Sequence, residues 1–238
     1  MFLRKTIVLL LMVPVLSMTF GIAEFGVERI MFKLVTQHLQ QGKVSKVEAE
    51  IYYSSLEGKL LTRFIEPVEQ LAVTNRFGEI SIYNESEQTV YRAQSQEYSS
   101  ENHMLYFFLQ GKTRDLGLRE LGFRQTSTEI SDDLVISFWE APSSVRHHIS
   151  KVELVHQDFV PVYSAYYNAE GDVVRKVYYT GYEDFLHIRL PLSITEFNYL
   201  PDGDSIVSRM RLSDVLINQE ARSSWFEFEI PPNARIIE

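Results

Sequence analysis

A two-residue hydrophobic period, running from Lys43 almost to the C-terminus, most constrains the fold of this chain. Segments rich in β-branched and aromatic residues alternate with short polar turns such as residues 168–172 and 201–204. This alternation is typical of strands. Parallel neighbours need long crossover connections, so turns this short predict antiparallel pairs. We therefore expect a mainly antiparallel β protein with a few helices, in the α+β class.

About a dozen strands are expected. They span residues 44–54, 59–65, 69–74, 80–83, 89–91, 134–139, 151–156, 160–168, 173–181, 193–199, 205–215 and 224–230. In the last of these segments apolar and acidic residues alternate cleanly, and Pro231-Pro232 then stops the ladder. A meander of this length has to curl on itself, so we expect an unclosed β-barrel.

Helices are expected in three places. In residues 24–41 mostly apolar side chains recur at three- and four-residue steps, before Gly42: Val27, Ile30, Met31, Leu34, Val35 and His38. Residues 100–110 predict a second helix and residues 115–121 a short third one. We expect these helices to cover the opening of the barrel as a lid.

Residues 1–23 have the pattern of a secretory signal peptide. Arg4 and Lys5 precede an apolar run from Thr6 to Phe20, and Gly21-Ile22-Ala23 offers a small-x-small cleavage site. An uncleaved membrane anchor is the alternative, since the run could nearly span a bilayer. Pro14 within the run and the small residues after it favour cleavage near Ala23. Residues 24–238 are then expected to form a single domain.

The amino-acid composition excludes several classes of binding partner and of site. The full chain has 23 Lys and Arg residues against 32 Asp and Glu, and losing Arg4 and Lys5 moves its net charge from −9 to −11. An acidic protein repels phosphate backbones, so we expect no nucleic-acid partner. The chain has no cysteine, which excludes disulfides, thiolate metal sites and a lipid-modified N-terminal cysteine. We expect a monomer.

The sequence offers little catalytic chemistry. It contains no His-Glu-x-x-His, phosphate loop, Gly-x-Ser-x-Gly or dinucleotide fingerprint. His147 and His148 would point to opposite faces of a strand, and the acidic pair Asp202 and Asp204 fits a turn better than a calcium loop. We expect no enzyme activity, no cofactor and no metal. A hydrolase with a site assembled only by the fold stays open as an alternative.

Two stretches of the sequence carry recognisable motifs. Residues 58–84 predict a strand, a proline, a strand, a glycine turn and a strand that ends in Tyr83-Asn84, and residues 226–234 contain Phe-x-Phe-x-x-Pro. Both resemble the LolA-like family of periplasmic lipoprotein carriers, which has the same run and a closing strand of the second kind. The resemblance implies an unclosed barrel whose helical lid covers an apolar cavity for acyl chains. It also implies an arginine after the second strand that holds the lid shut; Arg63 is nearby but several residues out of register.

This resemblance leads to a functional expectation. The protein would be a periplasmic carrier that binds acyl chains of lipoproteins or lipids and moves them toward the outer membrane, between an inner-membrane donor complex and an outer-membrane acceptor. The alternative is a non-transporting module that senses lipid or lipoprotein in the envelope. The expected cavity residues are Met104, Phe107 and Phe108 on the second helix, with Met31 and Leu34 on the first. Core packing is the competing interpretation for Met31 and Leu34.

Overall fold

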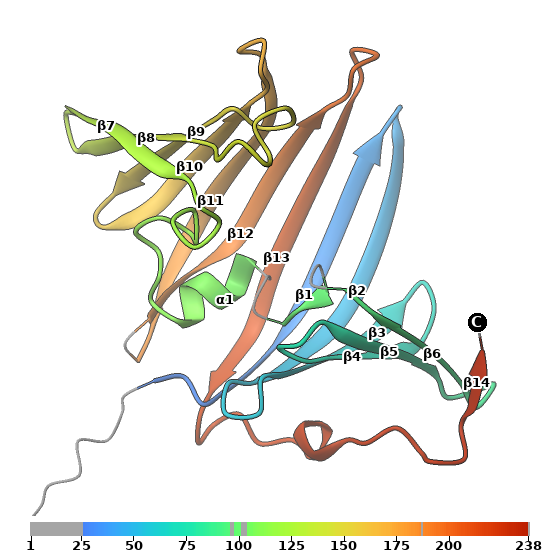
Figure 1. Ribbon diagram of the computed structural model, residues 1–238. Helices are drawn as coiled ribbons and strands as arrows, with labels where there is room; N and C mark the ends of the chain where they lie inside the picture. Colours follow the sequence, from blue (N-terminus) through green and yellow to red (C-terminus); the bar gives the residue numbers. More distant parts are fainter. Residues whose placement is uncertain (1–25, 96–97, 101–103, 187, 238) are drawn as a thin grey trace, which may run out of the picture.

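One curved, open sheet of fourteen strands forms the body of the protein (Figure 1). The computed structural model describes residues 26–95, 98–100, 104–186 and 188–237. The strands, in chain order, are β1 Arg29–Gln40, β2 Lys43–Ser54, β3 Lys59–Glu66, β4 Gln70–Thr74, β5 Glu79–Asn84, β6 Thr89–Gln94, β7 Arg124–Ser131, β8 Leu134–Glu140, β9 Lys151–Gln157, β10 Val160–Tyr167, β11 Val173–Phe185, β12 Ile188–Tyr199, β13 Ser205–Ile217 and β14 Arg235–Ile237. The helices are α1 Met104–Leu109 and the 3₁₀ helix η2 Ser224–Glu227.

The strands lie in the order β14-β6-β5-β4-β3-β2-β1-β13-β12-β11-β10-β9-β8-β7. Every neighbouring pair is antiparallel except β14 and β6. Short hairpins impose this order; Gln41 and Gly42, for example, both have positive φ and join β1 to β2 in register from Arg29↔Ser54 to Gln40↔Lys43. The terminal strands β7 and β14 do not pair with each other, so the sheet is unclosed.

The prediction of a helix over residues 24–41 is wrong, because Arg29–Gln40 forms strand β1 in the middle of the sheet. Near its start β1 is covered on both faces. Ile30 and Phe32 pack in one apolar cluster, and Met31 packs against another on the opposite side. Apolar residues therefore follow one another without alternation and imitate helical spacing.

Other expected elements also differ. Helix α1 is shorter than the predicted 100–110, and residues 115–121 form turns. The segment predicted as a strand over 224–230 begins as η2, where the Ser223 Oγ accepts a hydrogen bond from the Trp225 N–H at 3.2 Å. Strands β7 and β14 were not expected. With β1 they bring the described strands to fourteen rather than about a dozen.

Two apolar clusters hold the sheet, one on each face. The inner cluster lies on the concave face and joins strands β1 to β3 and β8 to β13 with α1 and the segment after it, through residues such as Phe32, Trp139, Val177, Phe108 and Leu118. The outer cluster lies on the convex face of β2 to β6. There the C-terminal tail, residues 218–234, packs Phe226 and its neighbours on Tyr52, Leu61 and Tyr83.

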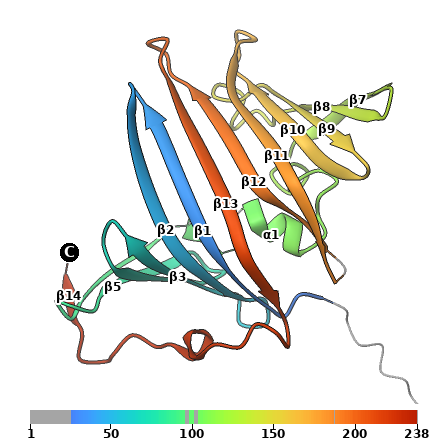
Figure 2. The same cartoon turned by 180° about the vertical axis from the view of Figure 1, so that it is seen from behind.

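Helix α1 lies against the concave face and is visible through the sheet from behind (Figure 2). The tail runs below β3 to β6 and ends as β14 beside β6 (Figure 1). No helix among the described residues combines the length and the apolar character needed to cross a membrane.

Candidate ligand-binding site

An apolar cavity lies between the concave face of the sheet and α1. Its walls come from three neighbouring strands, from α1 and from the segment before it: Phe32, Leu34, Ile51, Tyr53, Leu60, Thr62, Ser100, Tyr106 and Leu109. The cavity is small, with a volume of about 30 Å³. This is far below the roughly 300–1,000 Å³ of ordinary ligand pockets, so the cavity in this conformation has no room for a large ligand.

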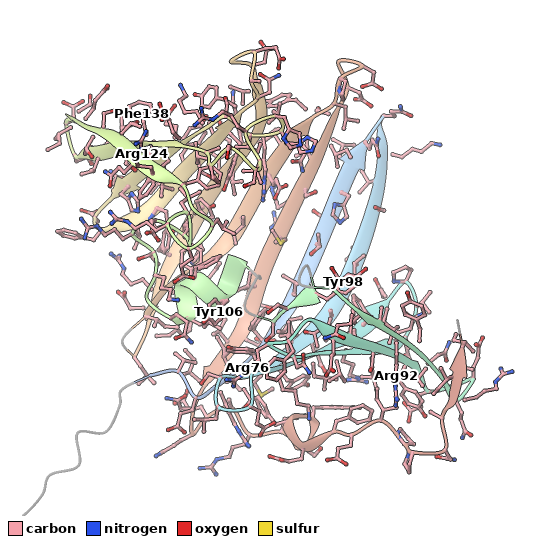
Figure 3. All side chains as sticks on the ribbon, viewed as in Figure 1. Arg76, Arg92, Tyr98, Tyr106, Arg124 and Phe138 are labelled. Carbon is pink, nitrogen blue, oxygen red and sulfur yellow. The ribbon has the colours of Figure 1, made fainter. Side chains whose placement is uncertain are left out.

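The period of two explains which side chains line the cavity. Phe32 and Leu34 on β1 are two residues apart and share the concave face, as successive odd or even positions of a strand must. The same holds for Ile51 and Tyr53 on β2. Leu60 on β3 continues the row across the sheet. Opposite these strands, α1 contributes Tyr106, which Figure 3 labels, and Leu109.

Aromatic contacts fasten α1 to the sheet. Phe108 is only 1% exposed, and its ring centre lies 5.8 Å from that of Tyr179 and 6.4 Å from that of Tyr182. Burial raises the pKa of both tyrosines well above the ordinary value, so their phenols stay neutral. The Phe107 ring packs on Gly117, which has a φ of +79°. The helix is therefore held by apolar surface, which hydrocarbon can replace.

A wider groove opens beside the cavity at the end of the sheet where β1 begins. It has a volume of about 530 Å³ and is lined by Gly26, Val27, Glu28, Ser55, Leu56, Leu109, Gln110, Gly111, Leu186 and Ile188. Leu109 lines both the groove and the cavity. The groove and the apolar cavity therefore meet at this side chain.

The concave face beyond α1 is polar. Arg175 pairs with Glu196 at 2.9 Å, and the Asn198 amide donates to Glu196 at 2.6 Å. Farther across the sheet, His38 Nδ1 and the Ser208 hydroxyl are hydrogen-bonded at 2.8 Å. The same face therefore offers apolar surface under α1 and hydrogen-bonding groups beside it.

The five expected cavity residues divide among different places. Leu34 lines the cavity, Phe108 is buried in the inner cluster and Phe107 packs against that cluster. Met31 packs against the outer cluster, on the other face of β1, because a strand turns residues three apart to opposite sides. The Met104 side chain lies outside the described part of the structure. Tyr106 and Leu109 were missed, although they belong to the predicted helix.

Other residues singled out from the sequence lie away from the cavity. Arg63 pairs with Glu50 at 2.9 Å and stands over the Trp225 ring on the outer face, so it does not contact α1. His147 and His148 have ring centres 3.9 Å apart. The Asp204 N–H donates to Asp202 within a turn. Among the described residues, no three His, Asp or Glu side chains gather as metal ligands.

The open antiparallel sheet with a short helix on its concave face is a LolA-like fold. A solved structure of a LolA superfamily protein from Nitrosomonas europaea matches 86% of this chain and 92% of its own, with a TM-score of 0.55 and 14% identity. A DUF1329 family protein from Desulfovibrio piger matches 84% of this chain and 90% of its own, with a TM-score of 0.56 and 14% identity.

A third solved structure is a protein domain from Vibrio parahaemolyticus assigned to outer membrane lipoprotein sorting. It matches 85% of this chain and 90% of its own, with a TM-score of 0.55 and 14% identity. No family model matches the sequence, and no curated protein matches it. At this identity the likeness establishes the fold.

Proposed function

We propose that this protein is a periplasmic carrier that binds the acyl chains of lipids or lipoproteins under α1. The observation that carries the proposal is the apolar cavity between β1 to β3 and α1, which meets the open groove at Leu109. The LolA-like fold supports the same function. The proposal assigns the protein no chemical step, cofactor or metal.

The small volume of the cavity leaves no room for an acyl chain in this conformation. For a chain to enter, α1 has to leave, which exposes side chains such as Phe108 and Leu109 at about 1.5–3 kcal/mol each. An acyl chain gains about 0.8 kcal/mol for each buried methylene. A chain of about ten methylenes therefore offsets the exposure of two or three side chains. Helix α1 acts in this proposal as the lid.

The rest of the proposed setting follows the sequence. Residues 1–23 would direct export and be removed, and residues 24–238 would act as one domain. The polar stretch of the concave face around Arg175 and Glu196 would lie beside the polar end of the cargo. Donor and acceptor proteins at the two membranes would meet the carrier at the groove that Leu56 and Leu186 border.

Native mass spectrometry of the protein purified from its own envelope fraction tests the function. We expect adducts whose masses match acylated species and which vanish after extraction with organic solvent. A protein that consistently carries no acylated species, and takes up none when mixed with a lipopeptide, would contradict carriage. A protein partner held in fixed ratio, with lipid that is never passed on, would favour the sensing alternative.

A variant that fills the cavity tests the site. We expect Leu34→Trp to weaken binding of a fluorescent fatty acid by about tenfold or more, because the larger ring takes the space of the acyl chain. Leu34→Met, which nearly conserves volume, is the matched control and should bind like the original chain. Equal binding by the Trp variant would place the ligand elsewhere.

A further inference from the structure

A band of aromatic side chains crosses the outer, convex face of the sheet on the half that the tail does not reach. Strands β8, β10, β11 and β12 contribute Phe138, Tyr163, Tyr167, Tyr178, Phe197 and Tyr199, which we call the outer band. Each alternates along its strand with residues of the concave side such as Trp139, Tyr166 and Tyr179.

Neighbouring rings of the outer band touch across the strands. The ring centres of Tyr163 and Tyr178 are 5.0 Å apart, and those of Tyr178 and Phe197 are 5.9 Å apart in an edge-on arrangement. Tyr178 and Tyr199 remain 39% and 40% exposed. Figure 2 shows no described element over this side of β11 to β13. Tyr163, Tyr178 and Phe197 therefore form a continuous aromatic surface, and Tyr178 and Tyr199 are the band's most exposed members.

Amino groups lie over these rings. The Lys151 Nζ is 4.1 Å from the Tyr167 ring centre and 5.6 Å from that of Phe138, and the Lys176 Nζ is 5.7 Å from that of Tyr199. Neither amine forms an ion pair with any described residue. Two carboxylates share this face: Glu153 accepts a hydrogen bond from the Tyr167 hydroxyl at 2.8 Å, and Glu140, opposite Lys151 in the β8–β9 register, pairs with Arg124 at 3.2 Å. An added carboxylate would therefore meet two amines that form no ion pair with a described residue.

The other half of the outer face shows what such a surface binds. There Tyr52 and Tyr83 are 4% and 5% exposed, because the tail lies over them with Phe226 and Phe228. Cations fix the tail in place. The Lys59 Nζ donates to two tail carbonyls at 2.7 and 2.9 Å, and Arg29 pairs with Glu227 at 2.8 Å. An extended segment that mixes aromatic and acidic residues thus covers aromatic rings flanked by cations.

We infer that the outer band is a docking surface for a partner protein, which lays an extended segment rich in aromatic and acidic residues across β8 to β12. Aromatic side chains of the segment would pack between the exposed rings, and its carboxylates would pair with Lys151 and Lys176. This surface is on the opposite side of the sheet from the cavity. A partner could therefore bind it whether or not α1 lies over the cavity. The inference does not depend on the proposed function.

Fluorescence anisotropy with a labelled synthetic peptide that repeats residues 224–230 of the tail tests this inference on the purified chain. We expect the peptide to bind, and the double variant Lys151→Glu with Lys176→Glu to weaken binding by about tenfold or more. Tyr178→Ser should weaken it as well. The matched control, Lys43→Glu with Arg92→Glu, makes the same charge change at exposed sites outside the band and should bind normally.

Three results would overturn the inference. The first is no binding by the original chain. The second is equal binding when both glutamates of the peptide are replaced by lysine, which would remove the role of charge. The third is normal binding by the double variant Lys151→Glu with Lys176→Glu together with lost binding by Lys59→Met. This result would mean that the peptide only displaces the chain's own tail. Urea unfolding of each variant establishes that it is folded.

Discussion

At the scale of single residues, β1 shows that a shift of one position along a strand moves a side chain from one face of the sheet to the other. Leu34 and Met31 are three residues apart, and the strand sends Leu34 to the cavity and Met31 to the outer cluster. Likewise, β2 directs Ile51 and Tyr53 to the cavity and Tyr52 to the tail. One strand therefore connects the proposed ligand site to the tail through neighbouring residues.

Gly117 is required where the segment after α1 passes Phe107. A Cβ at this position would lie far inside van der Waals contact with the Phe107 ring, and φ is +79°. We expect Gly117→Ala to lower the free energy of unfolding by about 2–4 kcal/mol through clash and backbone strain. The control Gly171→Ala, at φ +90° with no atom near the added Cβ, should lose only about 1 kcal/mol. Equal losses in urea unfolding would contradict the packing of Phe107.

Because of Tyr52, the free energy of unfolding is expected to fall at alkaline pH. Burial, followed by the hydrogen bond to Glu50, raises the pKa of Tyr52 to about 12 from an ordinary value of 10.0. Since the raised pKa belongs to the folded state, its contribution is complete below pH 10.0 and is lost as the pH rises toward about 12. We expect Tyr52→Phe to show a smaller fall of the urea midpoint across this range. An unchanged fall would show that Tyr52 does not titrate with unfolding.

At the scale of elements, the tail acts as a strap over β2 to β6. Lys59, half-buried, donates to the carbonyls of Phe226 and Phe228. We expect Lys59→Met to lower the free energy of unfolding by about 2–4 kcal/mol, since hydrogen bonds from a charged group are worth about 1.5–3 kcal/mol each. Lys33→Met, which removes an exposed pair with Asp214, should lose less than about 1 kcal/mol. Similar losses in urea unfolding would contradict the role of the tail.

Alternation along the sequence was enough to predict strands where one face is more buried than the other, as in β8. It was not enough in three places, each for a physical reason. β1 is covered on both faces, so its apolar residues do not alternate. β7 is exposed on both faces and carries no apolar period. In the Phe226–Ile230 segment apolar and acidic residues alternate, but the segment is part of the tail that covers the outer cluster and is not a strand of the sheet.

The same limit applies to the cavity. Helix α1 was expected from its apolar composition, and it does lie on the concave face. Which of its side chains reach the empty space depends on how the helix is docked, and its sequence does not determine that. Tyr106 and Leu109 border the cavity, whereas Phe108 packs toward Tyr179 and Tyr182.

At the scale of the whole molecule, the two faces of the open sheet are covered differently. The concave side holds apolar surface under a short helix, and the convex side is covered by the tail over only one of its halves. An unclosed sheet allows α1 to leave without breaking any strand pair. The proposed function requires this motion, because the cavity has a volume of only about 30 Å³.

The most direct test measures the distance between α1 and the sheet with and without cargo. The chain has no cysteine, so Gln110→Cys and Ser213→Cys, both at exposed positions, would carry the only two spin labels. Double electron–electron resonance should show one distance in the empty protein and a second, longer one when a palmitoylated lipopeptide is bound. An unchanged distance with the lipopeptide bound would contradict the claim that α1 gives up its place to an acyl chain.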